Sequence, residues 1–276
     1  MSKRRWVILL VTFFLYGFTI WWLNMFSNIL YFWDKFYTEK TTAAFFCERA
    51  EMQMLIRQPI NTFSNIVYWL VAVAILRRGW KDQSKQKKYN IISANPFYSI
   101  TYGMIMLYTF LASTFFHSSL IEFASRLDYS AVYSLSLFPL MYFSHRVWLI
   151  EIGVPSNQKH PQSTRVLIAI FTTLYVLLTF VLPEGWGKYT VLAIIFFLIA
   201  FAIFVERRDP GKTNKNYLWV CFASILIAVM WYAFDVYKVL CDPNSFIQPH
   251  SMWHLFAGIS SFYFYMYIRS EKNKLD

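Results

Sequence analysis

A bundle of membrane-spanning α-helices is the fold class that this sequence predicts, and three observations support it. Hydrophobic residues make up 57% of the 276 residues and aromatic residues 21%. Charged residues reach only 15%, against roughly 25% in an average soluble domain. The apolar residues fall in blocks of about 20, the helix length that crosses a hydrocarbon core. Because lipid offers the backbone no hydrogen-bond partners, such blocks must be helices.

Eight apolar blocks are expected to form the spans, with both termini in the cytoplasm. Most of the 26 Lys and Arg residues lie at the two termini and in the loops after the second, fourth and sixth blocks. Such an excess of basic residues is typical of the cytoplasmic side, and its alternation fits an even number of spans. The blocks lie at 6–31, 59–78, 97–119, 127–150, 165–182, 188–205, 216–240 and 250–269.

The first block follows a basic start and is expected to be a retained helix. A cleaved signal peptide has a shorter apolar region that ends in small residues. The stretch from Trp6 to Tyr31 is longer, is rich in aromatic residues and has no Ala-x-Ala ending. We therefore interpret it as a transmembrane helix of the protein.

The net charge of +11 does not predict nucleic-acid binding. The basic residues lie in loops between apolar blocks, where topology and contact with anionic lipid headgroups explain them. We therefore expect a membrane lipid, and no nucleic acid, as the partner.

The three cysteines fall into two groups. Cys221 lies within a span and is expected to be a small packing residue. Cys47 and Cys241 both fall in loops on the predicted non-cytoplasmic side, where oxidising conditions permit a disulfide. Spacing in the sequence leaves their pairing open, because it does not establish the distance between them.

Five polar residues occupy positions near the ends of spans where such side chains are costly in lipid. Each is therefore a candidate for a functional site. On the predicted topology all of them lie toward the non-cytoplasmic face, where the third span ends and the fourth and eighth begin. They are Ser113, His117, Asp128, His250 and His254.

His250 and His254 are spaced to bind one metal ion. Side chains at i and i+4 lie on one face of a helix, and a His-x-x-x-His pair binds zinc in metalloproteases. No acid lies between the two histidines here, and capping of the helix start is the alternative role for the pair. His117 can supply a third nitrogen from another helix. Three protein ligands with an open fourth position are typical of a catalytic zinc.

Asp128 and Ser113 are expected to serve the same site. Asp128 follows His117 after a short turn, and we interpret it as the base for a metal-activated water or as an orienter of a ligating histidine. Ser113 precedes His117 by four residues and shares its helix face. Its hydroxyl can stabilise an oxyanion or orient a ligand.

Three further polar residues are given other roles. His145 and His160 fall in the loop predicted on the opposite, cytoplasmic side, and we interpret them as bystanders. Asp235 lies inside the seventh block and is expected to be a satisfied polar partner in the bundle. The alternative is that Asp235 orients a metal ligand.

Several of these segments resemble the alkaline ceramidase family, part of a superfamily of seven-span hydrolases that includes the adiponectin-type receptors. FCE at 46–48 is followed by INTFSN at 60–65, which resembles the family's Asn-Thr-x-Ser-Asn signature. STFFHSSL at 113–120, with Leu127-Asp128 after it, is similar to the second motif. WYAFDVYKVLC at 231–241 and HSMWH at 250–254 resemble the last two spans. Together the motifs cover about residues 45–270, and their joint spacing is specific.

The resemblance implies a seven-helix domain in residues 35–276, with residues 1–34 as an additional N-terminal transmembrane helix. It also implies a zinc site formed by His117, His250 and His254. It further implies a catalytic pair, Ser113 and Asp128, and a disulfide between Cys47 and Cys241. Eukaryotic members further carry an acidic calcium site. Here Phe45 and Gln58 stand in place of two of its acids and only Glu48 clearly remains, which puts calcium in doubt.

The activity that the resemblance implies is zinc-dependent hydrolysis of the amide of ceramide, or a related N-acyl lipid, to a fatty acid and a sphingoid base. One alternative is a hydrolase of another lipid amide or ester. Another is a lipid receptor with a structural zinc, a role that does not require Asp128 and Ser113. A transporter is disfavoured, because its polar residues would lie near mid-span.

Overall fold

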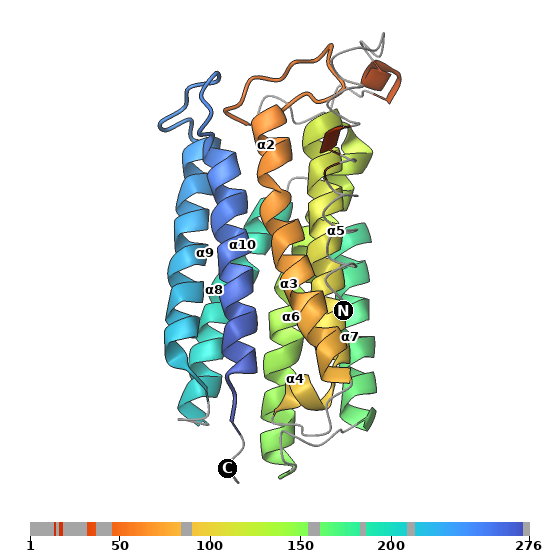
Figure 1. Ribbon diagram of the computed structural model, residues 1–276, viewed down its shortest axis with the longest axis vertical. Coiled ribbons are helices and arrows are strands. Elements are labelled where there is room, and N and C mark those ends of the chain that lie inside the picture. The colour runs from red at the N-terminus through yellow and green to blue at the C-terminus, as the bar shows by residue number, and fades with distance from the viewer. Residues whose placement is uncertain are drawn as a thin grey trace.

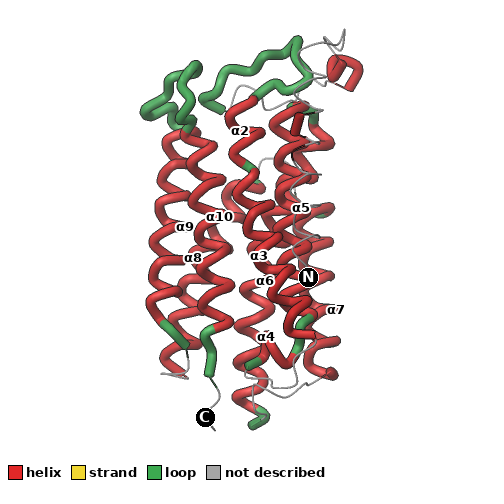
Figure 2. The backbone as a smooth tube through the Cα atoms, viewed as in Figure 1, coloured by secondary structure: helices red, strands yellow, loops and turns green. Residues whose placement is uncertain are grey.

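The computed structural model describes residues 14, 17, 18, 32–36, 46–83, 90–153, 161–182, 186–208 and 213–272. These residues form helices and no β-strand (Figure 2), which confirms the all-α fold class. The elements are η1 (Phe32–Phe36), α2 (Pro59–Ser64), α3 (Ile66–Gln83), α4 (Ile91–Ala94), α5 (Phe97–Ser119), α6 (Glu122–Glu151), α7 (Pro161–Phe180), α8 (Gly187–Arg208), α9 (Lys215–Val236) and α10 (Pro249–Arg269).

The expected spans from residue 59 onward are all helical. Within the described residues, five helices are long and apolar enough to cross a membrane, with α2 and α3 taken as one. This supports an integral membrane protein. The more polar α6 and α10 have 30 and 21 residues. The expected span at 6–31 lies outside the described residues apart from three positions, so the additional helix, the count of eight and the sidedness stay predictions.

The long helices run side by side along the long axis of the molecule (Figure 1). The last helix, α10, packs against α9 and α3, while α5 packs against α3 and α6, and α6 in turn contacts α7 and α8. The segments 46–58 and 237–248 lie at one end, drawn at the top of Figure 1 and called the upper end below. There α5 ends and α2, α6 and α10 begin, so residues from distant parts of the chain meet.

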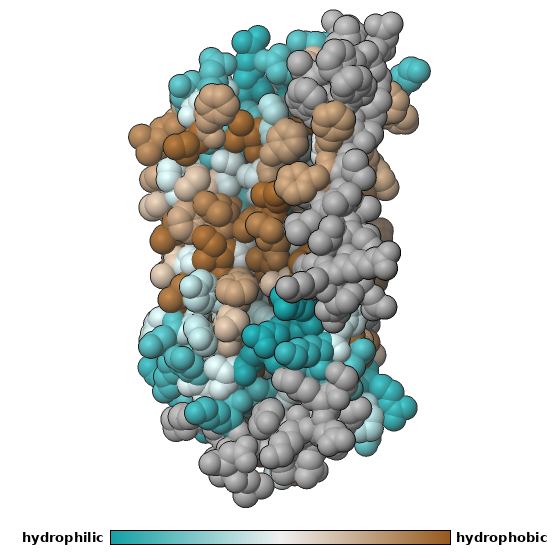
Figure 3. Space-filling view, in the orientation of Figure 1, coloured by the Kyte–Doolittle hydropathy of each residue, from teal (hydrophilic) through white to brown (hydrophobic). Residues whose placement is uncertain are grey.

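A hydrophobic belt crosses the middle of the molecular face in Figure 3, with hydrophilic residues above and below it. Large apolar side chains of the bundle are exposed, among them Leu111, Phe196, Phe197, Trp219 and Leu226. Exposed apolar surface of this extent is unfavourable in water and is the expected surface of a bundle in lipid.

Polar side chains tie the helix ends together at the upper end. The α2 helix begins at Pro59, which is favourable because the first turn of a helix has no use for a proline N–H. The Glu48 carboxylate accepts the N–H groups of Ile60 at 2.7 Å and Asn61 at 2.8 Å. Donors in the first turn of a helix lack partners within the helix, so Glu48 caps α2.

The opposite end corrects one sequence expectation. His145 was expected in a loop, but α6 continues to Glu151 and the His145 side chain is buried in the bundle. His145 contacts the hydroxyl of Tyr98 and lies 3.1 Å from that of Ser163. The prediction failed because partners on other helices satisfy this polar side chain. His160 lies outside the described residues.

Arg146 belongs to a buried ionic cluster that joins three helices and the segment after α10. Its Nη1 donates to Glu206 and to the Tyr267 hydroxyl, each at 2.9 Å, and its Nε lies 3.8 Å from Glu271. A guanidinium can be buried when carboxylates and hydrogen bonds compensate its charge. The cluster therefore connects α6, α8 and α10 far along the bundle from the upper end.

Candidate metal centre

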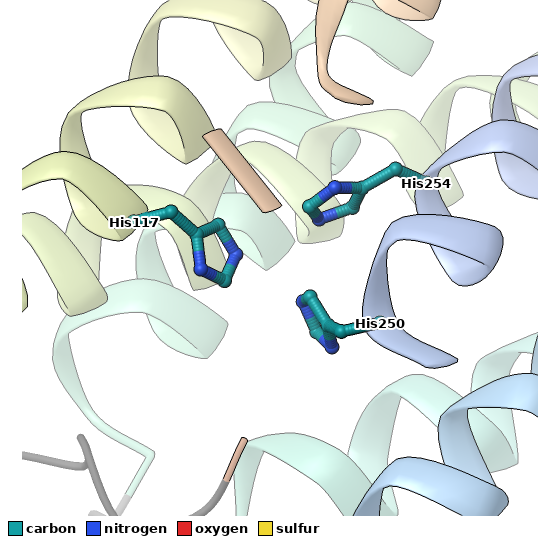
Figure 4. Close-up of side chains that lie close together, drawn as sticks. All are labelled: His117, His250 and His254. Carbon is teal, nitrogen blue, oxygen red and sulfur yellow. The ribbon is translucent and has the colours of Figure 1, made fainter. Parts of the chain in front are cut away.

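Three buried histidines meet at the upper end of the bundle. His117 lies in the last turn of α5, and His250 and His254 lie in the first two turns of α10. One ligand nitrogen from each lies within 4.8 Å of the others, and the ring centroids are 4.7 to 5.1 Å apart. Figure 4 shows the rings projecting from the two helices toward one another. The predicted convergence of these three residues therefore agrees with the geometry.

The side chain of Gln58 orients His117. Its Nε2 donates to the Glu48 carbonyl at 3.2 Å, so its Oε1 is the atom that faces His117 Nδ1 at 2.9 Å. Since an amide oxygen only accepts, the proton of the neutral imidazole lies on Nδ1. The lone pair of His117 is then on Nε2.

The hydroxyl of Ser64 has the same effect on His254. Ser64 Oγ donates its proton to the Asn61 carbonyl at 2.8 Å and lies 2.7 Å from His254 Nδ1. With its proton engaged, the hydroxyl acts as an acceptor toward the ring. The lone pair of His254 is therefore also on Nε2.

Asp235 stands beside the third histidine. Its Oδ2 lies 3.3 Å from His250 Nδ1, and its Oδ1 accepts the N–H of Cys47 at 2.7 Å. The contact does not have hydrogen-bond geometry, and His250 Nδ1 has no hydrogen-bond partner among the described residues. Asp235 is therefore a buried polar residue with partners inside the bundle, as the sequence predicted. One of the residues that it approaches, His250, is a candidate metal ligand.

A disulfide lies next to the Asp235 carboxylate. Cys47 and Cys241 are bonded, which confirms the pairing that the resemblance implied. The bond connects the segment before α2 with the segment after α9, and Cys47 also contacts Asp235 through its N–H. Cys221 is free and buried, as expected for a packing residue.

The donor set fits a zinc ion. His117 and His254 each have an acceptor at Nδ1, so their Nε2 lone pairs are available for a metal. His250 offers a ring nitrogen within 4.8 Å of the other two ligand atoms, and three neutral imidazoles are a common set of zinc ligands. His117 Nε2 is buried and has no hydrogen-bond partner among the described residues. Such an atom is costly unless something binds it, so a cation between the rings would satisfy it.

A cavity of about 320 Å³ opens beside the histidines. His250 and His254 line it together with Ser113 and Asp128, whose side chains interact electrostatically. The predicted catalytic pair therefore faces the same space as the candidate ligands.

A second cavity, of about 110 Å³, continues from the first toward the middle of the bundle. The two cavities share Tyr68, Val132, Val191 and Trp253 as walls, and most of the second lining is apolar. Polar chemistry is thus available at the upper end, with hydrophobic space next to it.

Glu48, the one acid left of the expected calcium site, is engaged as the cap of α2. Burial raises the pKa of its carboxyl to about 7, although the N–H groups of Asn61 and Ile60 oppose the shift. Gln58, which stands where the resemblance expects an acid, contacts His117 instead. Phe45 lies outside the described residues.

Gln58 and Ser64 were not assigned roles from the sequence. Gln58 stood out only as a departure from the family's pattern, and Ser64 only as part of a signature. The signal for Ser64 was present: polar residues at 61, 64 and 65 repeat with helical spacing at the start of an apolar block. Gln58, directly before a helix-starting proline, carried no comparable signal.

Comparisons with known proteins agree with this site. The family model described as Ceramidase matches residues 38–274, which is most of the chain. A search of curated proteins finds no match. The matched region contains all three histidines, Ser113, Asp128, Asp235 and both disulfide cysteines. The chain therefore belongs to the ceramidase family.

Proposed function

We propose that this protein is a zinc-dependent intramembrane amidase that hydrolyses ceramide, or a closely related N-acyl lipid, to a fatty acid and a sphingoid base. The observation that carries the proposal is the convergence of His117, His250 and His254. One ligand nitrogen of each lies within 4.8 Å of the others, and His117 and His254 each have an acceptor at Nδ1. Family membership supports a hydrolase that acts on the amide bond of ceramide.

The cavities support a lipid substrate. An amide near the histidines would lie beside Ser113 and Asp128, while hydrocarbon would follow the apolar walls at Val132, Val191 and Trp253. Such a split between polar and apolar walls is typical of sites that bind amphipathic ligands.

The residues around the cavity have distinct tasks in this proposal. Zinc bound by the three imidazoles supplies Lewis-acid chemistry, since it polarises carbonyl oxygens and lowers the pKa of water. The carboxylate of Asp128 accepts a proton from the attacking water and returns it to the nitrogen of the leaving amine. Ser113, which lines the same cavity and interacts electrostatically with that carboxylate, helps to orient it. The C–N bond breaks, hydroxyl adds to the acyl carbon and hydrogen adds to the amine.

The ligand assignment is tested by metal analysis of purified protein. The wild type should contain about one zinc per chain, and His117→Ala should lose both zinc and ceramide hydrolysis. Cys221→Ser, a change at a buried thiol away from the histidines, is the matched control and should keep both. Full zinc content in His117→Ala would show that the ligand set is wrong.

The reaction is tested with a panel of labelled lipids and detection of products by mass spectrometry. Ceramide should be cleaved faster than N-acyl or glycerol lipids without a sphingoid base. Asp128→Asn should retain zinc and lose turnover by at least about 100-fold, as expected for a proton-transfer residue. Unchanged turnover in Asp128→Asn would remove its catalytic role, and zinc without any turnover in the wild type would favour a receptor.

A further inference from the structure

A short helix outside the family region packs against the end of α5, the helix that carries His117. The element η1 precedes residue 38, where the match to the family begins. Trp33 Nε1 donates to the Leu55 carbonyl at 2.8 Å, and its ring lies 5.7 Å from that of Phe115 on α5. Asp34 Oδ1 accepts from Arg57 Nη2 at 2.7 Å. Thus η1 is docked on the segment before α2 and on the end of α5.

Arg57 connects η1 to the interior of the protein, because it contacts both Asp34 and the end of α5. Its side chain is fully buried, with an exposed fraction of 0%. The guanidinium donates to the carbonyls of Met52 at 3.2 Å and Ser119 at 3.0 Å, and to the Asp34 carboxylate. The Ser119 carbonyl is at the C-terminus of α5, where a cation is favourable. The two carbonyls accept hydrogen bonds from the guanidinium but carry no negative charge, whereas the Asp34 carboxylate provides a counter-charge for it.

The backbone next to Arg57 continues to a candidate ligand. Arg57 N–H donates to the Ser118 carbonyl at 3.0 Å, and Gln58 N–H donates to the His117 carbonyl at 3.1 Å. The Gln58 side chain then accepts from His117 Nδ1. A single two-residue segment therefore connects η1, the end of α5 and the imidazole of His117.

We propose that Asp34 and Arg57 are positioning residues of the metal centre. Through their ion pair, η1 clamps the end of α5 and keeps Gln58 in the position that orients His117. This inference rests on the metal centre of the proposed function. It adds to that centre a residue, Asp34, which lies outside the part of the chain that matches the family.

Removal of the Asp34 charge should weaken metal binding without touching a ligand. Asp34→Asn leaves the buried guanidinium without this counter-charge, so Arg57 and the Gln58 beside it should shift toward solvent. Changes to groups that orient a metal ligand typically reduce metal affinity by 10–100-fold. We expect Asp34→Asn to release zinc about tenfold faster than the wild type.

The experiment uses full-length protein in detergent, loaded with zinc and mixed with a chromogenic chelator. Cobalt(II)-substituted samples provide a visible spectrum that reports the geometry of the ligands. Asp34→Glu should restore slow release because it retains the carboxylate. Glu51→Gln is the matched control, since it removes a carboxylate from an exposed ion pair with Arg49 in the same segment. It should behave as the wild type.

The outcomes separate this inference from the proposed function. A wild-type protein that binds no metal would contradict both. A wild type that binds zinc, with Asp34→Asn showing the same release rate and cobalt spectrum, would overturn the clamp alone. A lower unfolding temperature with an unchanged cobalt spectrum would also overturn it, because that indicates a merely structural contact. If Asp34→Asn does not fold, Arg57→Lys carries the same expectation, since it keeps the charge but loses the guanidinium contacts.

Discussion

The helices α3 and α10 approach each other closely at Gly258, and adding one methyl group there should destabilise the protein. A Cβ at this position would lie 2.5 Å from Cγ2 and 3.2 Å from Cβ of Val67. Ordinary carbon contacts are about 3.5–4.0 Å. A rotation of Val67 about χ1 moves its methyl groups but not its Cβ, and this rotation is restricted in a helix. The helices must therefore separate, and overpacking of this kind costs about 1–3 kcal/mol.

The consequence for the site follows from the helix repeat. His254 precedes Gly258 by four residues and lies on the same face of α10, so displacement of the helix moves a candidate ligand. Gly258→Ala should lower the unfolding temperature in detergent by several degrees and lower zinc retention. Val67→Ala should reduce this cost, because a double-mutant cycle between contacting residues gives a coupling of about 0.5–3 kcal/mol. Equal unfolding temperatures for wild type and Gly258→Ala, or a cost that Val67→Ala leaves unchanged, would refute the reasoning.

Three other predictions concern stability. Reduction of the Cys47–Cys241 disulfide should cost about 2–5 kcal/mol, seen as a lower unfolding temperature under reducing conditions. The variant with both cysteines changed to Ser should not respond to reductant. Glu206→Gln should cost about 3 kcal/mol in thermal unfolding, because it removes a counter-charge from buried Arg146; a wild-type melting curve would contradict this. The raised pKa of Glu48, about 7, means that the folded state holds its proton more tightly than the unfolded state. Stability of the metal-free protein should therefore fall as the pH rises from about 4.5 to about 7. Glu48→Gln should flatten this fall relative to the wild type, and an identical pH dependence would disprove it.

Hydrophobic block length and composition were sufficient for the helical class and for the bounds of most helices, because the membrane core restricts the backbone to few structures. The His-x-x-x-His spacing likewise predicted that His250 and His254 share one helix face, since helix geometry is local. His145 shows where local reasoning failed. A polar residue near the end of an apolar block resembles a loop residue, and its burial is possible only because Tyr98 and Ser163 on other helices contact it.

What the sequence by itself determined about this protein is its membrane class, its run of helices and the identity of the histidines that bear the site. Only the tertiary structure decided which nitrogen of His117 and of His254 is free, because that depends on Gln58 and Ser64, which lie at the two ends of α2, far along the chain from both histidines. It alone joined Asp34 to Arg57, and it confirmed the pairing of Cys47 with Cys241 that the resemblance implied. The physical reason is that hydrogen bonds, ion pairs and disulfides are set by short distances between residues that the linear chain keeps far apart.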